Sequence, residues 1–280
     1  MIPKIIHLMW LDKNNPHNPG FPSKYTNYMD QWKNMNPSWQ IMYWNYSDIE
    51  REFPDFMPII EKIPVWISKC DFARVLVLYK YGGVYIDLDF FPLRPFDDHV
   101  TDRDLLLIYE PQEHSKYWNF DGLILNSIMG ASPNHEFFKG FIDVSIHKIL
   151  TTDPHSWNVI ASIGPNGLYS YYSQYWKHSF AIDPLDTCLF IPSLQSFIPN
   201  KTTGEMCNVI KPYCTTKWDE GTEWFNGTTP QFHIVRRRSS EPFTLRNVLK
   251  VILKIILFIL FIMLVTMLII YMGPEYGGSK

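Results

Sequence analysis

The spacing of hydrophobic residues over the first half of the chain predicts alternating strands and helices. Runs of apolar residues predict strands, and apolar residues three or four positions apart predict helices. We therefore expect strands at residues 3–11, 40–44, 84–88, 105–109 and 123–130. Helices are expected at residues 23–35, 47–53 and 70–79, with another after Pro133. This alternation indicates an α/β domain with a mostly parallel sheet flanked by helices.

Local signals and a change of composition refine this picture. Ser47, with Glu50 three residues later, has the pattern of a capping box, and Gly82 is a natural stop for the helix at 70–79. After about Thr151 the periodicity weakens, and Pro, Trp, Tyr and Ser become more frequent. We expect this half to form loops and helices over the carboxyl edge of the sheet, where open α/β folds bind ligands.

The C-terminal part of the chain has a different pattern. Residues 255–272 contain no charge, and the apolar run extends back to residue 251 with only Lys254 interrupting it. At about 1.5 Å per residue, this length crosses the hydrocarbon core of a bilayer, which is about 30 Å thick. We predict one transmembrane helix at 251–272 and a short tail at 273–280, a buried core helix being the alternative.

Basic residues precede this span and set its expected orientation. Residues 236–250 form a basic juxtamembrane linker that includes Arg236, Arg237 and Arg238, whereas only Lys280 follows the span. The positive-inside rule predicts a single-pass C-terminal anchor with the large domain, residues 1–235, in the cytosol. The same arginines could instead form a nuclear or nucleic-acid patch.

The N-terminus and the glycosylation sequons bear on the same question. The chain opens on an apolar strand pattern without a charged n-region, an h-region and a cleavage site, so we expect no secretory signal. Sequons at Asn45, Asn200 and Asn226 would be usable only if the domain were lumenal.

Composition excludes one class of partner. The 280 residues are 46% hydrophobic and 16% aromatic, which is ample material for a core. With 25 basic and 28 acidic residues the net charge is −3, so no nucleic-acid partner is expected.

The four cysteines show no zinc-binding spacing. We expect free thiols, with a Cys207–Cys214 disulfide as the alternative.

Residues 69–93 contain the densest group of chemically capable side chains. Asp71 and Arg74 lie one turn apart in a predicted helix, and Asp87 and Asp89 follow in a predicted strand. Side chains alternate faces along a strand, so these two carboxylates should point the same way. Like charges on one face are costly to bury unless a hard cation lies between them, and such a cation commonly binds a diphosphate as well.

Five segments of the chain, in order, carry a family resemblance. They read IPKIIHLMW at 2–10, NPSWQIMYWN at 36–45, the DXD block at 69–98, ILNSIMGASPNHEFF at 124–138 and IGPNGL at 163–168. They resemble the glycosyltransferases with a DXD sugar-binding region, which include fungal α-1,6-mannosyltransferases and mannosyl-inositolphosphoceramide synthases. The glucosylating domains of clostridial toxins are more distantly similar. The resemblance implies a GT-A-like fold over residues 1–235.

The resemblance also implies roles for the acidic cluster. Asp87 and Asp89 would hold Mn²⁺ or Mg²⁺ against the diphosphate of a nucleotide-sugar donor, where the cation would assist departure of the leaving group. Asp71 would accept hydrogen bonds from sugar hydroxyls, and Arg74 would contact the donor sugar or phosphate. From the residues alone, Asp71 and Arg74 could equally form a helical ion pair.

Further donor-binding residues follow from position and resemblance. Trp10 ends the first predicted strand, where its ring could stack on the nucleobase or belong to the core. Tyr85 shares a strand face with Asp87 and could line the donor site, and Asn126 matches a sugar-contacting asparagine of the family.

One segment departs from the family pattern. Many members have a histidine followed by Ser-Trp, whereas this chain has KWDEGTEWFNG at 217–227. Asp219 could complete the metal site, and Thr222 and Trp224 could contact the donor, as in the toxin-like pattern. An acidic surface loop would explain the same residues.

Together these features predict a membrane-anchored, metal-dependent, retaining glycosyltransferase. It would move a hexose from a nucleotide sugar to a glycan or lipid acceptor. The alternatives are a nucleotide-sugar hydrolase and a non-catalytic carbohydrate-binding membrane protein with a degenerate transferase fold.

Overall fold

The computed structural model of the chain describes residues 1–17, 20–111, 115–116, 119–190, 193–194, 201–202 and 212–216. Its contacts divide the chain into two compact units, Met1–Gly227 and Thr228–Lys280. The predicted linker at 236–250 and the predicted span at 251–272 lie outside the described residues. Within the described ranges, every helix is too short or too polar to cross a membrane.

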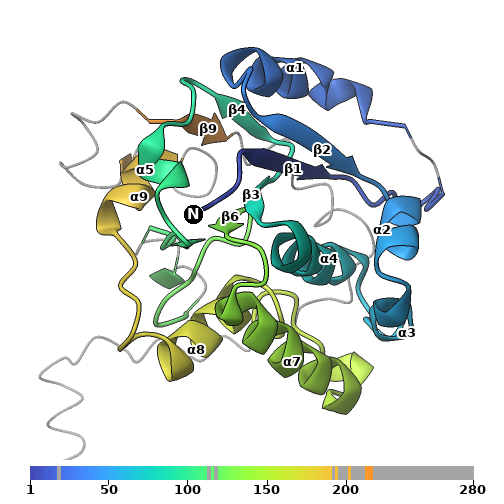
Figure 1. The fold of residues 1–280 in the computed structure, drawn as a ribbon. Coiled ribbons are helices and arrows are strands. Elements are labelled where there is room, and N and C mark those ends of the chain that lie inside the picture. Colours follow the sequence, from blue (N-terminus) through green and yellow to red (C-terminus); the bar gives the residue numbers. More distant parts are fainter. Residues whose placement is uncertain are drawn as a thin grey trace, which may run out of the picture. The chain divides into compact units, whose positions relative to one another are not determined.

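A five-stranded sheet forms the centre of the first unit (Figure 1). Its strands are β1 (Ile5–Met9), β2 (Gln40–Trp44), β3 (Gly83–Ile86), β5 (Leu105–Leu106) and β6 (Ile128–Ala131). They lie in the order β2-β1-β3-β6-β5. β1 is parallel to β2 and β3, whereas β6 is antiparallel to both of its neighbours. The predicted mostly parallel sheet is therefore confirmed, with β6 as the reversed strand.

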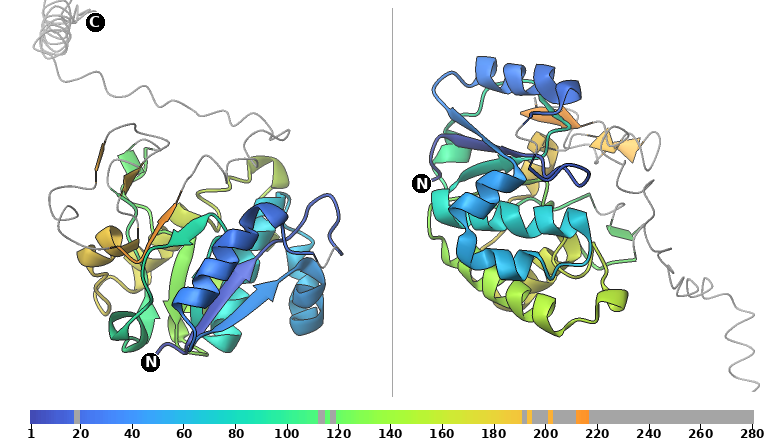
Figure 2. Two further views of the ribbon diagram at one scale, coloured as in Figure 1. Left: turned by 90° about the horizontal axis from the view of Figure 1, so that it is seen from above. Right: turned by 90° about the vertical axis from the view of Figure 1, so that its right-hand side faces the viewer.

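Helices cover both faces of this sheet (Figures 1 and 2). One face packs against α4 (Trp66–Tyr81), α7 (Glu136–Thr151) and α8 (Pro165–Tyr175), and the other packs against α1 (Thr26–Met35). Along β3, Tyr85 belongs to the core on the α4 side, while Val84 and Ile86 belong to the core on the α1 side. This alternation is the period of two that a strand buried on both faces requires.

Shorter elements complete the described fold. The helices are α2 (Tyr46–Glu52), α3 (Met57–Ile60), α5 (Asp98–Thr101) and α9 (Pro184–Phe190), with 3-10 turns at Ser23–Tyr25, Pro54–Phe56 and Pro154–Ser156. Two small antiparallel pairs lie outside the main sheet: β4 (Phe90–Pro92) with β9 (Cys214–Thr216), and β7 (Ser193–Leu194) with β8 (Lys201–Thr202). The weak periodicity after residue 151 thus corresponds to short helices and strand pairs.

The start of α2 differs from the sequence-based expectation. Asn45, not Ser47, caps this helix: its side chain accepts from the Asp48 amide, and Asp48 accepts from the Asn45 amide. The capping box was therefore predicted two residues too late. The Asn45 side chain is buried in this cap. It is thus not free for glycosylation in the folded domain, whichever compartment holds it.

Gly82 and Gly83 shape the turn between α4 and β3. Both have positive φ, 64° and 87°, a conformation that favours glycine. A Cβ on Gly83 would lie 2.6 Å from the Ile5 carbonyl oxygen, so its absence allows β1 and β3 to pair closely. His7 of β1 stabilises the same turn. Its Nε2 donates to the Gly82 carbonyl at 2.7 Å, and its Nδ1 accepts from the Trp44 indole at 3.0 Å.

The cysteines only partly follow the prediction. Cys70 and Cys214 are free, as expected, but Cys188 is disulfide-bonded. The alternative Cys207–Cys214 disulfide is wrong because the Cys214 thiol is free and buried. Spacing in the sequence did not reveal the bonded cysteine, because pairing depends on which distant segments the fold brings together.

Candidate active site

The two aspartates of the DXD motif lie just beyond the carboxyl end of β3. β3 ends at Ile86, and Leu88 and Asp89 form a turn in which the Phe90 amide donates to the Asp87 carbonyl at 3.2 Å. The expectation that both aspartates lie within one strand is therefore wrong. The strand ends sooner because the chain must leave the sheet to enter β4.

Arg74 is the centre of a buried network behind these aspartates. Its Nη1 lies 3.3 Å from Asp87 Oδ1, and its Nη2 lies 3.3 Å from Asp71 Oδ1. It also donates to the carbonyls of Asn126 at 2.8 Å and Cys70 at 3.3 Å. The Arg74 and Asp71 side chains are only 4% and 5% exposed. The expected helical ion pair is present, and the guanidinium extends it to the DXD motif.

Tyr85 and Asn126 hold the two carboxylates that face Arg74. The Tyr85 hydroxyl donates to Asp87 Oδ1 at 2.5 Å, and the Asn126 amide donates to Asp71 Oδ1 at 2.9 Å. The Arg74 guanidinium also lies over the Tyr85 ring, 4.7 Å from its centroid. Tyr85 and Asn126, predicted to bind the donor, are thus in place beside the acidic cluster and support it from within.

Burial changes the acidity of this cluster. It raises the pKa of the Asp71 carboxyl to about 7, with Arg74 opposing the rise and the Asp87 charge adding to it. Burial also raises the pKa of Asp87, against the effects of Arg74 and the Tyr85 hydroxyl. One guanidinium therefore does not fully compensate the neighbouring carboxylates.

Asp87 and Asp89 have the chemistry of a divalent-cation site. The Asp87 side chain is 33% exposed, and its inner oxygen, Oδ1, is the atom that contacts Tyr85 and Arg74. Its second oxygen makes no hydrogen bond or ion pair to the described residues. Carboxylate oxygens are the ligands that Mg²⁺ and Mn²⁺ prefer. The two residues thus fit the metal that the sequence predicts.

Trp10 lies at the same edge of the sheet as the DXD turn. It directly follows β1, which is parallel to and paired with β3, so the carboxyl ends of both strands meet there. Its ring is only partly buried and lies 6.2 Å from the Tyr25 ring, with the Lys24 ammonium 5.7 Å away. This position permits stacking on a nucleobase and is consistent with the prediction.

Asp219, Thr222 and Trp224 lie outside the described residues, so their predicted roles stay predictions. The strand that precedes them is described, however. β9 pairs with β4 so that Thr216 is opposite Phe90, the residue after Asp89. The chain leading into residues 217–224 therefore runs beside the DXD turn.

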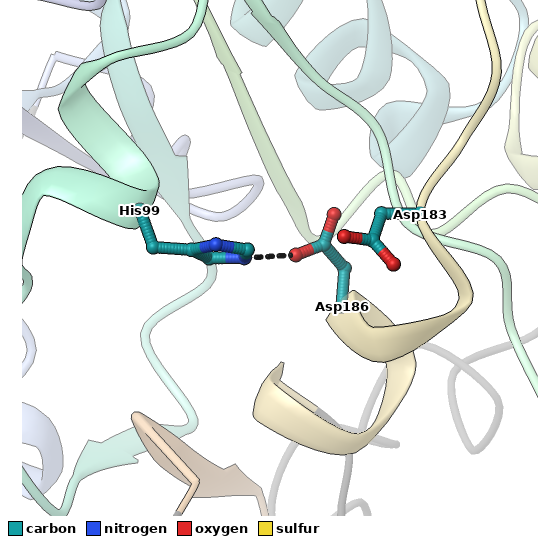
Figure 3. Close-up of side chains that lie close together, drawn as sticks. All are labelled: His99, Asp183 and Asp186. Atoms are coloured by element: carbon teal, nitrogen blue, oxygen red, sulfur yellow. Dashed lines mark hydrogen bonds and ion pairs between the residues drawn. The ribbon is translucent and has the colours of Figure 1, made fainter.

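A second group of possible metal ligands was not found from the sequence. His99, Asp183 and Asp186 have ligand atoms within 4.8 Å of one another, and Figure 3 shows His99 bonded to Asp186. Arg103 also binds Asp186, at 2.5 Å, and lies 3.8 Å from Asp183. Because this guanidinium already supplies a positive charge to both carboxylates, we interpret the group as an ion-pair clasp between α5 and α9. His99 and Asp186 are too far apart in the chain for spacing to reveal it.

Comparison with known proteins supports the assignment of this site. The family model described as "Glycosyltransferase sugar-binding region containing DXD motif" matches residues 22–106, which include Asp71, Arg74, Tyr85, Asp87 and Asp89. An uncharacterised glycosyltransferase of Acanthamoeba polyphaga mimivirus is 24% identical over 185 residues, or 64% of this chain and 68% of that protein.

Two yeast enzymes are also similar. Inositol phosphoceramide mannosyltransferase 1 of Schizosaccharomyces pombe is 30% identical over 175 residues, which are 59% of this chain and 49% of that protein. A mannosyl phosphorylinositol ceramide synthase of Saccharomyces cerevisiae is 27% identical over 184 residues, which are 63% of this chain and 44% of that enzyme. The chain thus spans about half the length of these two relatives.

Among solved structures, the PaToxG glycosyltransferase matches with a TM-score of 0.43 and 15% identity, over 63% of this chain and 70% of that one. A score this low is uninformative, so the assignment rests on the sequence matches. Residues 22–106, which carry the candidate site, are therefore similar to the sugar-binding region of glycosyltransferases with a DXD motif.

Proposed function

We propose that this chain is a metal-dependent, retaining glycosyltransferase that uses a nucleotide-sugar donor. The observation that carries the proposal is the buried network in which Arg74 joins Asp71 to Asp87 at the carboxyl edge of the sheet. Two aspartates on an exposed surface would need no buried arginine beside them, because solvent and salt would screen the repulsion between their charges.

The charge of this edge favours a divalent cation. Asp71, Asp87 and Asp89 are three carboxylates, and the Arg74 guanidinium contacts Asp71 and Asp87. Asp87 and Asp89 would hold Mn²⁺ or Mg²⁺, which when bound offsets the charge that develops on a departing nucleoside diphosphate.

Arg74 acts in this proposal as a positioning residue. Its guanidinium is buried, and its nitrogens contact Asp71, Asp87 and the carbonyls of Asn126 and Cys70. The predicted contact of Arg74 with the donor stays a prediction. In the proposed site, Arg74 fixes Asp87 for the cation and Asp71 for the sugar hydroxyls, while Trp10 stacks on the nucleobase.

The acceptor is proposed from the relatives and from the C-terminal sequence. The similar yeast proteins are named for transfer of mannose to inositol phosphoceramide, so mannose and a sphingolipid of this kind are the first candidates. A membrane anchor at 251–272 would hold the site close to such a lipid, or to a membrane glycan.

A donor screen tests the proposal. The detergent-solubilised full chain is incubated with Mn²⁺, an inositol phosphoceramide and a panel of GDP- and UDP-sugars, and products are identified by mass spectrometry. We expect hexose transfer that stops when the metal is chelated. Release of free sugar that no acceptor diverts would instead indicate a hydrolase. Absence of metal-dependent donor binding would indicate a non-catalytic protein.

The anchor is tested separately. Deleting residues 248–280 should move the protein from the membrane pellet to the supernatant, because the apolar run is removed. A truncated chain that stays in the pellet contradicts the proposed anchor.

A further inference from the structure

The segment after Asp89 is not part of the main sheet. Phe90 begins β4, which pairs only with β9 within the described part of the chain. Besides this pairing, the Trp32 indole of α1 donates to the Phe90 carbonyl at 2.9 Å. β9 is therefore the strand partner of the segment that directly follows Asp89.

Tyr213 directly precedes β9 and joins it to neighbouring parts of the fold. Its amide donates to the Leu189 carbonyl of α9, and its carbonyl accepts from the Leu93 amide, both at 2.7 Å. Its hydroxyl donates to Asp97, and the Arg94 guanidinium lies 3.6 Å from its ring centroid. The Tyr213 side chain is fully buried. Through these contacts Tyr213 joins β9 to α9 and to the segment at residues 93–97.

The ion-pair clasp at Asp186 stabilises α9, the helix whose Leu189 carbonyl accepts from the Tyr213 amide. Asp186 is completely buried in α9, and it binds His99 at 2.9 Å (Figure 3). It also binds Arg103 at 2.5 Å. The clasp thus holds α9, and with it the Leu189 carbonyl that accepts from Tyr213.

β9 in turn lies close to Asp89. Cys214, the first residue of β9, is buried, and its Sγ lies 3.5 Å from the Phe190 carbonyl oxygen. β9 pairs with β4 so that Thr216 is opposite Phe90, the residue after Asp89, and Cys214 is opposite Pro92.

We infer that Tyr213 is a positioning residue for Asp89, and that it sets the affinity of the DXD motif for its divalent cation. The inference rests on the proposed function, because it takes Asp89 as a metal ligand. Residues that orient a ligand from behind commonly change metal affinity by about 10- to 100-fold when they are replaced. Tyr213 would act in this way through β9 and β4 rather than by direct contact.

The test is a titration of the detergent-solubilised full chain with Mn²⁺ alone, following free Mn²⁺ by electron paramagnetic resonance. Tyr213→Phe removes only the hydroxyl, and Tyr213→Leu also removes the ring that stacks on Arg94. We expect the dissociation constant for Mn²⁺ to rise a few-fold in the first variant and about tenfold in the second. In an Asp89→Asn background, neither change should weaken binding further, because their effect passes through Asp89.

Tyr171 provides the matched control. It is a buried tyrosine that packs between α7 and α8, against Phe137 and Phe141. Tyr171→Phe and Tyr171→Leu should lower the melting temperature by a similar amount and leave Mn²⁺ binding unchanged.

The possible outcomes are distinct. If both Tyr213 variants bind Mn²⁺ like the unmodified chain, or if the Tyr171 variants weaken binding equally, the positioning role is wrong and the proposed function stands. If the unmodified chain binds no Mn²⁺, both proposals fail.

Discussion

Asp87 and Asp89 are separated by one residue, but two different parts of the fold hold them. Asp87 follows a strand of the main sheet and is bound from behind by Tyr85 and Arg74, which are both buried. Asp89 leads into β4, which pairs with a strand more than 120 residues later in the chain. One half of the site is therefore built from nearby sequence and a packed core, and the other from a long-range strand pair.

This difference suggests that the Asp87 half contributes more to stability and the Asp89 half more to metal binding. Tyr85, Arg74 and Asn126 hold Oδ1 of Asp87 and Oδ1 of Asp71 from within the core, and breaking these contacts should cost stability. Asp89 lies in the turn that leads out of the main sheet into β4, so changes there should affect metal binding more than folding.

Replacing either aspartate by asparagine should abolish transfer, with a loss of about 10³-fold or more, because each change removes a negative ligand of the metal. The two variants should differ in stability. Asp87→Asn takes a counter-charge from buried Arg74 and should lower the melting temperature, whereas Asp89→Asn should leave it nearly unchanged. Thermal unfolding and product formation measure both effects, and retained turnover in Asp89→Asn would sink the metal assignment.

Arg74→Met should destabilise the domain by about 3 kcal/mol, because it leaves the carboxylates of Asp71 and Asp87 buried without their cation. Urea unfolding measures this change. Arg51→Met is the control: Arg51 pairs with Asp48, but its side chain is 64% exposed, so its loss should cost far less stability than the loss of Arg74. Equal costs at the two positions would contradict the distinction between a buried network and a surface pair.

His7, a buried residue of β1, should make the stability of the folded domain depend on pH. Burial lowers the pKa of His7 to about 4, against the effect of its bond to the Gly82 carbonyl, whereas an unfolded histidine has a pKa of about 6.5. Between these values the unfolded chain binds the extra proton, so stability falls as pH decreases from 6.5 towards 4. The full loss is about 3 kcal/mol.

Urea unfolding at several pH values tests this prediction. His7→Gln should flatten the dependence on pH in that window, whereas the same change at exposed His155 should not. A slope that persists unchanged in His7→Gln would assign the acid sensitivity to other groups.

Trp10→Leu should have the smallest effect. Base stacking on an aromatic ring is worth about 1–3 kcal/mol, so donor affinity should fall about tenfold while the folded state and Mn²⁺ binding are preserved. Calorimetry with the nucleoside diphosphate measures this change. A lower melting temperature with unchanged nucleotide affinity would show that Trp10 is a core residue only.

Much of the part of the site around Asp87 was predictable, because its residues lie close together in the sequence. Asp71 and Arg74 are one helical turn apart, Gly82 ends the helix, and the following strand delivers Tyr85 and Asp87. These relations follow from helix and strand periods, which a single sequence displays. The sheet strand at 40–44 was also placed at its observed bounds.

Strand and helix ends were less predictable. Asp87 and Asp89 were placed inside a strand that ends at Ile86, and the cap of α2 was placed two residues late. Apolar residues continue past both boundaries, so the pattern does not reveal where backbone pairing stops.

The sequence by itself thus indicated the kind of chemistry, through a DXD pair, a supporting helix and a resemblance to a family of glycosyltransferases. Only the tertiary structure showed that Arg74 joins Asp71 to Asp87, that Asp186 is clasped by His99 and Arg103, and that β9 lies beside Asp89. The physical reason is distance along the chain. Contacts between different elements, from Arg74 and Asp87 to Phe90 and Thr216, depend on how whole helices and strands pack, and no local period records that packing.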